Sequence, residues 1–300
     1  MDINNDIEAV VTSFNQKSMV YEAVRSLCGQ TRKPKRIMIV DDGSTDESSV
    51  DILEKIEADR GLPVPVLVIR QPNGGVCAAR NAGIRKVQAP LALVLDGDDN
   101  LEPSFIEEVS KLLEENPDMA AASSWLHTFG VLEAIVRPAG GSVRDFLSRN
   151  CCPATHICRR SAWERCGGYD ETMRSGFEDW DFFLSMLEAD PGACIGIVEK
   201  PLVNYRTISA SSNIKSMEKR LEIMRYMINK HIGVYKEHVA DAVLGIEATS
   251  ISRLYGWESE MACSKLAGGK LCEGSNQFLE SPSYGDGGMA AAVRIMSAGA

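Results

Sequence analysis

Short apolar runs alternate with amphipathic stretches along the first two thirds of the chain. The runs are rich in Val, Ile and Leu and are expected to form strands, and the amphipathic stretches are expected to form helices. The expected strands are 7–14, 36–40, 64–70 and 91–95, and the expected helices are 19–28, 46–58, 76–87 and 104–115. This alternation predicts an α/β fold with a mostly parallel central sheet and helices on both faces.

Local sequence features predict where several helices begin and end. Pro103 fits the first turn of helix 104–115. Ser44 or Thr45 can cap the helix that follows them. Ser161 is expected to cap a short helix over 162–165, which Gly167 would end.

The remaining part of the chain is less regular. Residues 119–150 lack a clear period and are typical of loops that hold a substrate. From residue 214 the pattern changes to long helices, and the last residues are rich in Gly, Ser and Ala. We therefore expect a main domain over 1–213, a helical segment over 214–256, and a tail or extra packing element over 257–300.

One apolar stripe stands out in the helical segment. Met217, Leu221, Met224 and Ile228 recur at helical spacing. We favour a helix that packs this stripe against the core. Contact of a surface helix with an anionic membrane is the alternative.

Composition places the chain among ordinary globular proteins. It has 300 residues, of which 44% are hydrophobic and 25% charged, and these values exclude disordered and fibrous classes. Asp and Glu outnumber Lys and Arg by 42 to 32, which gives a net charge of −10. A nucleic-acid backbone typically binds a basic surface, so we expect no nucleic-acid partner. We expect an anionic ligand to be held by a bound cation or by helix N-termini.

Sequence features also bear on location. No apolar run approaches the ~18 residues of a membrane-spanning helix, and the first residues lack the pattern of a secretory leader. The nine cysteines are odd in number and scattered, which favours reduced thiols. The sequence therefore predicts a cytoplasmic protein.

Two expected strands end in polar residues. The first is the run from Val10 to Asn15, and the second passes through Val40 into Asp41 and Asp42. Ligands bind at the carboxyl ends of strands in open α/β sheets. Asp41 and Asp42 could form a structural turn, or a carboxylate there could accept hydrogen bonds from a nucleobase.

A third motif lies between the third strand and the next helix. Gly74 and Gly75 would let the backbone approach a ligand, and Arg80 would lie about one turn into the helix. A guanidinium there suits a diphosphate because its planar fork donates two hydrogen bonds at once. An ordinary loop-to-helix junction is the alternative. No dinucleotide-binding fingerprint and no Walker loop occur in the sequence.

The fourth motif has the sharpest chemistry. The apolar strand Leu91–Leu95 runs directly into Asp96, Asp98 and Asp99. Asp96 and Asp98 would share one side of the chain if the extended run persists. Carboxylates so close together raise one another's pKa values, and a divalent cation relieves the repulsion. An acidic helix-capping turn is the alternative to a metal site.

These motifs, in this order, resemble the GT-A fold of family 2 glycosyltransferases, which are inverting enzymes that use nucleotide-sugar donors. The resemblance covers about residues 7–207. It implies that Thr12 and Asp42 contact the base, that Arg80 lines the nucleotide side, and that Asp96 contacts the ribose. It also implies that Asp98 and Asp99 bind Mn²⁺ or Mg²⁺. The helices after residue 213 would then be a C-terminal extension.

The resemblance gives meaning to a fifth stretch. Family members carry a Gly-Gly-aromatic-Asp turn, here with Gly168, and then a Glu-Asp pair that opens a helix. By position, Asp179 is the general base and Glu178 orients acceptor hydroxyls, while Trp180 offers a flat face to a sugar on the acceptor side. A helix N-terminus would favour the carboxylate form of Asp179. The alternative is that these acids only complement the helix dipole.

The chain departs from the family after the last core strand. A histidine often follows there, but this chain has Ile208. We therefore expect the metal to rely on the Asp cluster, the diphosphate and water, or Arg206 to close over the phosphates.

The expected function is metal-dependent transfer, with inversion, from a nucleotide-diphosphate sugar, with UDP favoured. The acceptor would be a glycan, a lipid-linked molecule, a peptide or a small molecule, as in cell-surface polysaccharide synthesis. The location would be the cytoplasm, with contact at the inner face of the membrane as an option.

Two other functions stay open. One is a non-catalytic module that binds sugar or nucleotide. The other is a sugar-phosphate nucleotidyltransferase, although Thr12–Asn15 occupies the place of the Gly-rich loop of those enzymes. A nicotinamide-dependent dehydrogenase is disfavoured because the fingerprint is missing.

Overall fold

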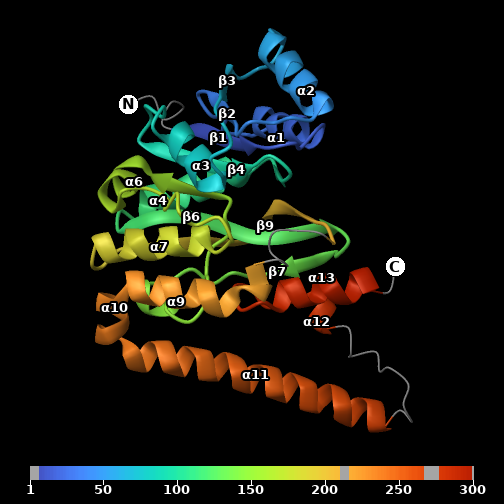
Figure 1. Ribbon diagram of the computed structural model, residues 1–300, viewed down its shortest axis with the longest axis vertical. Helices are drawn as coiled ribbons and strands as arrows, with labels where there is room; N and C mark the ends of the chain where they lie inside the picture. Colours follow the sequence, from blue (N-terminus) through green and yellow to red (C-terminus); the bar gives the residue numbers. More distant parts are fainter. Residues whose placement is uncertain (1–6, 210–215, 267–276, 299–300) are drawn as a thin grey trace.

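A computed structural model describes residues 7–209, 216–266 and 277–298. The strands form one nine-stranded sheet with the order β3-β2-β1-β4-β8-β6-β9-β5, and β7 pairs with β6 (Figure 1). The strands are β1 Ile7–Ser13, β2 Ile37–Asp41, β3 Val66–Arg70, β4 Leu91–Asp96, β5 Asn100–Leu101, β6 Met119–Gly130, β7 Ala134–Val136, β8 His156–Arg159 and β9 Cys194–Thr207.

Helices surround this sheet. They are α1 Met19–Cys28, α2 Glu47–Ala58, α3 Val76–Ile84, α4 Phe105–Glu115, α5 Val143–Phe146, α6 Arg160–Cys166, α7 Glu178–Ala189, α9 Arg220–Lys230, α10 Ile232–Glu237, α11 Val239–Leu266, α12 Gln277–Glu280 and α13 Gly288–Ala298. Among the described residues, no helix combines the length and apolar character needed to cross a bilayer.

The N-terminal half of the sheet is parallel. β3, β2, β1 and β4 pair in that order, and every residue of β1 and β2 is buried because helices cover both faces. Thr12 lies opposite Asp96, and Ser13 lies opposite Asp41. The polar strand ends therefore meet at one edge of the sheet.

The two faces have separate cores. Val11, Ile39 and Leu93 point to the face covered by α1, α2, α4 and α13, whereas Val10 and Val94 point to the face covered by α3, α6 and α7. This division follows from the alternation of side chains along a strand. The predicted α/β class, with a mostly parallel core and flanking helices, is confirmed.

Residues 119–150 differ from the prediction. Their first part is the long strand β6, which pairs in parallel with β9 and antiparallel with β8. The strand was hard to recognise because residues 120–124 are Ala and Ser, which give little hydrophobic contrast although all are buried. Asn150, in the last part, reaches the functional site.

Several helix ends also differ in detail. Asp46, and not Ser44 or Thr45, caps α2: its carboxylate accepts a hydrogen bond from Ser49 N at 3.0 Å. α6 begins at Arg160, so Ser161 lies inside the helix and does not cap it. Gly167 ends α6 in a left-handed conformation with φ 82°, as predicted.

Part of the expected stripe of the helical segment packs against the core. Met224 and Ile228 are partly buried there, and the adjacent Ile223 and Met227 are buried. Leu221 is 86% exposed, so the expectation is wrong for this residue. Further along, α11 is a single helix that crosses the expected boundary at 256, and it lies at the end of the molecule remote from β1–β3 (Figure 1). The expected boundary at 213 falls outside the described residues.

The end of the chain returns to the sheet. Met289, Ala292 and Val293 of α13 are buried in the core that contains Leu126 and Val136. Residues 284–290 thereby reach the same side of the molecule as the carboxyl ends of β1 and β4, where they line a cavity described below.

Candidate functional site

The site is built where the parallel strands end. The Thr12 hydroxyl donates to Asp96 Oδ1 at 3.0 Å, which ties the end of β1 to the end of β4. Asp96 is partly exposed and lines a cavity. The structure therefore brings these two predicted donor-binding residues together.

Arg80 has a different environment from the one expected for a diphosphate ligand. Its guanidinium is 1% exposed and donates to both oxygens of Asp96 at 2.9 Å and to Glu178 at 3.0 Å. Burial lowers the pKa of Arg80, but the charges of Asp96, Tyr169 and Glu178 raise it by more. The pKa therefore lies well above its usual value. Arg80 thus links α3 to β4 and α7, and its charge is paired with Asp96 and Glu178.

Asp42 is also satisfied by the protein. Its carboxylate accepts from Gln71 Nε2 at 2.7 Å and from the backbone N–H groups of Gly74 and Gly75 at 2.8 and 2.7 Å. The predicted turn therefore exists and orders the Gly74–Gly75 loop. Asp42 could still accept a hydrogen bond from a nucleobase through a remaining lone pair.

The extended run does not continue past Asp96. Asp99 N donates to Asp96 O at 3.1 Å and closes a turn through Gly97 and Asp98, so the expectation that Asp96 and Asp98 share one side is wrong. Gly97 is required in this turn because an added Cβ would lie 2.6 Å from the backbone oxygen of Thr12. Asp98 Oδ1 accepts from Gln16 Nε2 at 3.2 Å.

Electrostatics in this turn are unbalanced. Burial, and then the charge of Asp96, raise the pKa of Asp98 to about 6. Burial, and then Asp98, raise the pKa of Asp99 well above its usual value. Carboxyl groups in this state gain most from a nearby cation.

The turn offers a partial metal site. The donors are carboxylate oxygens, which suit Mg²⁺ or Mn²⁺, and the buried Oε1 atom of the neighbouring Gln16 has no hydrogen-bond partner within the described chain. No group of three or more candidate ligands among His, Cys, Asp and Glu occurs in the described residues. Asp98 and Asp99 could therefore supply only some of the ligands of a bound cation.

Arg206 holds the acidic turn in place. Its backbone N–H donates to Asp99 Oδ1 at 2.8 Å, and its Nε donates to Asp98 O at 2.9 Å. The guanidinium also pairs with Glu22 at 2.6 Å. Ile208, just beyond, is exposed. The expected closure of Arg206 over phosphates stays a prediction.

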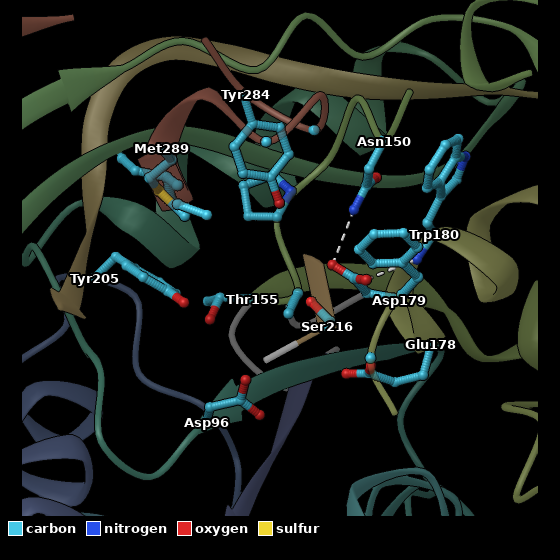
Figure 2. Close-up of a pocket in the computed structure, with 18 of the residues that line it drawn as sticks. Asp96, Asn150, Thr155, Glu178, Asp179, Trp180, Tyr205, Ser216, Tyr284 and Met289 are labelled. Carbon is cyan, nitrogen blue, oxygen red and sulfur yellow. Dashed lines mark hydrogen bonds between the residues drawn. The ribbon is translucent and has the colours of Figure 1, made fainter. Parts of the chain in front are cut away.

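A cavity of about 150 Å³ lies beside Asp96 (Figure 2). Asp96 and Asp179 face it from different elements, β4 and α7, and the C-terminal segment closes it with Tyr284 and Met289. Thr155 lines the same space, and its buried hydroxyl has no hydrogen-bond partner among the described residues. The cavity therefore joins the predicted base to the predicted donor residues.

Asp179 lines this cavity and has a perturbed pKa. Its Oδ1 accepts from Trp180 N at 2.8 Å and its Oδ2 accepts from Asn150 Nδ2 at 2.9 Å. Burial, and then the charge of Glu178, raise its pKa to about 7. The backbone N–H of Trp180 at the helix N-terminus favours the carboxylate, as expected, but burial and Glu178 outweigh it.

The other predicted acceptor-side residues have structural roles. Trp180 is 1% exposed and its indole N–H donates to Phe146 O at 2.6 Å, so it forms the cavity wall and offers no open face. Gly168 does not line the cavity. An added Cβ there would lie 2.6 Å from Asn81 Oδ1, and the same Oδ1 accepts from Tyr169 N, so Gly168 lets the turn dock on α3.

Among the cavity residues that sequence reasoning missed, three bring polar groups to the site. Asn150 sits in a stretch without periodicity, and Tyr284 sits in the Gly-rich end, where Gly285 and Gly287 were the one sign of a tight turn. Arg220 brings a cation: its guanidinium lies 5.2 Å from the Phe177 ring centroid, and burial lowers its pKa.

Comparison with known proteins agrees with the geometry. The model of the family "Glycosyl transferase family 2" matches residues 8–164, which is more than half of the chain. The chain therefore belongs to glycosyltransferase family 2.

Relatives and solved structures extend the match beyond that range. An uncharacterised glycosyltransferase of Haemophilus influenzae is 26% identical over 232 residues, which cover 73% of this chain and 76% of the relative. A Borreliella burgdorferi cholesterol galactosyltransferase is 25% identical over 42% of this chain and 34% of its own. The crystal structure of S. aureus TarS 1-349 has a TM-score of 0.59 at 17% identity, covering 84% of this chain and 74% of that one. This last similarity shows a shared GT-A fold.

Proposed function

We propose that this glycosyltransferase moves a sugar from a UDP-sugar to an acceptor hydroxyl with inversion at the anomeric carbon. The observation that carries the proposal is Asp179, a partly buried carboxylate with a pKa raised to about 7, in one cavity with Asp96. TarS 1-349, which has the same fold, was solved with UDP and with UDP-GlcNAc. These complexes support a nucleotide-sugar donor for this chain.

Asp179 would act as the general base. A base works best when its pKa is close to the working pH, because it is then ionised and still basic enough to take a proton. Asp179 removes the proton of the acceptor hydroxyl, the acceptor oxygen bonds to the anomeric carbon, and the bond to the diphosphate breaks on the opposite face. A single displacement of this kind inverts the configuration.

Asp98 and Asp99 would hold Mn²⁺ or Mg²⁺ together with diphosphate oxygens and water. When bound, such a cation stabilises negative charge on the leaving diphosphate. Arg220 adds a positive charge in the wall of the same cavity. Arg80, through Asp96 and Glu178, keeps the donor side and the base side in register.

The test is thermal unfolding against UDP, GDP, CDP and dTDP, each with and without Mn²⁺. A ligand at 100 times its Kd adds about 2.7 kcal/mol of stability. We expect a rise in Tm with UDP that requires Mn²⁺ and is lost in Asp98→Ala. Proton NMR of the transferred sugar then reports the anomeric configuration. No shift with any nucleotide would favour the sugar-binding module instead.

The acceptor stays a broad proposal: a glycan, a lipid-linked molecule, a peptide or a small molecule. The Borreliella burgdorferi relative named as a cholesterol galactosyltransferase supports a lipid acceptor for part of the family. Assembly of cell-surface polysaccharide is compatible with the same chemistry.

A further inference from the structure

Asn150 is held in one orientation beside the base. Its side-chain oxygen accepts from Cys152 N at 3.1 Å, and its Nδ2 donates to Asp179 Oδ2 at 2.9 Å (Figure 2). An amide oxygen cannot donate and an amide nitrogen cannot accept, so the two bonds together fix which end faces Asp179. Asn150 is 7% exposed, which leaves it little freedom to turn.

The C-terminal turn, defined as residues 283–288, packs directly on Asn150. Gly285 has φ +76°, and an added Cβ would overlap the Asn150 carbonyl oxygen and lie 2.8 Å from its backbone nitrogen. The Tyr284 hydroxyl donates to Cys152 O at 3.1 Å. The turn therefore clamps Asn150 and the residue that orients its amide.

The turn is itself braced by its own side chains and by α11. Asp286 Oδ1 accepts from the Ser283 hydroxyl at 2.8 Å and from Gly288 N at 2.9 Å. Arg253 of α11 donates to Asp286 O at 2.6 Å and lies 3.3 Å from its carboxylate. A continuous set of contacts thus runs from α11 through the C-terminal turn and Asn150 to Asp179.

We propose that Asn150 is a positioning residue for the base and that the C-terminal turn holds it there, so that the end of the chain completes the acceptor side of the active site. This inference rests on the proposed function, in which Asp179 takes the proton. A hydrogen bond to the ionised carboxylate both aims its free lone pairs and favours ionisation.

Other groups around Asp179 do not replace Asn150. The titratable and charged groups that face this carboxylate or share its cavity are Glu178, Arg80, Asp96, Asp99, Cys152, Tyr205, Arg220 and Tyr284. Arg80 is already paired with Asp96 and Glu178. Without the amide of Asn150, burial and Glu178 would keep Asp179 protonated to a higher pH.

The kinetic test uses hydrolysis of UDP-N-acetylglucosamine with Mn²⁺, in which water is the acceptor and UDP is released. We expect Asn150→Ala to lower kcat about 10-fold or more with little change in KM for the donor, because a bond to a charged group is lost. The acidic limb of the kcat–pH profile should move up by about one unit. Asn150→Asp, which keeps the shape and removes the donor, should move it further. Asn116→Ala, which removes a bond to Leu112 O in α4, is the control.

A second pair of variants tests the clamp. Gly285→Ala and Gly192→Ala carry the same backbone penalty because both positions have positive φ, but an added Cβ at Gly192 meets nothing within 4 Å. We expect Gly285→Ala to reproduce the kcat loss and the pH shift of Asn150→Ala. Gly192→Ala should change stability alone.

An activity-independent measurement separates this inference from the proposed function. The carboxyl ¹³C resonance of Asp179, assigned with Asp179→Asn, is titrated in wild type, Asn150→Ala and Gly285→Ala. A higher pKa in both variants supports the inference even if the wild type hydrolyses no nucleotide sugar, in which case the proposed function alone fails. An unchanged Asp179 pKa in folded Asn150→Ala, with an unchanged kcat–pH profile where turnover is measurable, would overturn it.

Discussion

Helix α7 carries two aspartates, the partly buried Asp179 and the buried Asp181, that lie two residues apart and have opposite surroundings. Asp179 faces the cavity, where its side-chain partner is a neutral amide. Asp181 faces α9, where it accepts from Lys230 at 2.7 Å and from His231 at 3.0 Å. The negative charge of Asp181 is thus compensated by neighbouring cations, whereas that of Asp179 is not.

The compensated region is a polar junction between α7 and α9. Lys230 also pairs with Asp170 at 2.8 Å, and His231 also pairs with Glu188 at 2.6 Å. Burial raises the pKa of Asp170, but hydrogen bonds from Lys230 and its neighbours outweigh burial and hold it well below the usual range. In the cavity region, burial and like charge win at Asp98, Asp99 and Asp179.

The difference separates acids that stabilise the fold from acids that can react. At the junction, cations satisfy the carboxylates, so their ionisation contributes to stability. Among the described acids that line the cavity, Asp96 and Glu178 pair with a cation. Both share the charge of Arg80. Carboxyl groups with raised pKa values are typical of a site that binds a cation or exchanges a proton.

The largest expected effect comes from removing the shared cation. Arg80→Ala would leave the Asp96 and Glu178 carboxylates without their cation and a large buried side chain missing, which costs about 3–5 kcal/mol of unfolding free energy. Arg85→Ala, just beyond the end of the same helix, removes an exposed pair with Glu171 and should cost about 1 kcal/mol or less. Urea denaturation of both variants checks this, and similar losses would mean that Arg80 is not the hub.

The second prediction exchanges the charge of Asp179 for an amide. Asp179→Asn should lose transfer by about 10²-fold or more while it retains donor binding, measured as UDP release and as calorimetric affinity. Transfer at the wild-type rate would show that Asp179 is not the base.

The same variant should differ from wild type in how its stability depends on pH. The folded pKa of Asp179 is about 7, above the unfolded value of about 3.9, so the native state binds more protons between them and wild-type stability falls as pH rises through this range. Asp179→Asn lacks this loss and should gain stability relative to wild type as pH rises from about 4 to 7. A constant difference would contradict the raised pKa.

The sequence predicted the parallel half of the sheet and its motif residues because both depend on local patterns. A buried parallel strand is a continuous apolar run, and its carboxyl end is where the polar residues start. Thr12 and Asp96 could therefore be placed at one edge of the sheet from the order of the residues alone, and the strand register confirms it.

The sequence did not predict partners that depend on distant packing. Asn150 meets Asp179 across 29 positions, and the C-terminal turn reaches Asn150 from the far end of the chain. The same limit applies to Arg80. Its position beside a Gly-rich loop suggested a phosphate ligand, but its guanidinium is paired with Glu178, which lies 98 positions away in the sequence. Motif positions identify residue types, whereas pairing decides which of them stay free.

The third prediction breaks the junction. Lys230→Met removes the ammonium shared by Asp170 and Asp181 and should cost about 1–3 kcal/mol, less than a fully buried pair because Lys230 is 31% exposed. Donor hydrolysis should change little, since the junction lies outside the cavity. Lys236→Met, at an exposed position of α10, is the control. A loss of kcat as large as that of Asp179→Asn would show that the two regions are not separate.

The smallest expected effect is the pH dependence of the junction. Burial lowers the pKa of His231, but Asp181 and Glu188 outweigh burial and raise it above the usual value. The stabilisation from the charged imidazole is therefore fully present below the unfolded pKa of about 6.5 and is lost as pH rises through the folded pKa. Comparing wild type with His231→Gln by denaturant unfolding at pH 6 and pH 9 should give the larger stability difference at pH 6. The folded pKa is raised at both His231 and Asp179, so in both comparisons wild type loses stability relative to the variant as pH rises. A larger His231→Gln difference at pH 9 would mean that His231 is neutral in the folded protein and that cations do not distinguish the junction from the cavity in the way its contacts indicate.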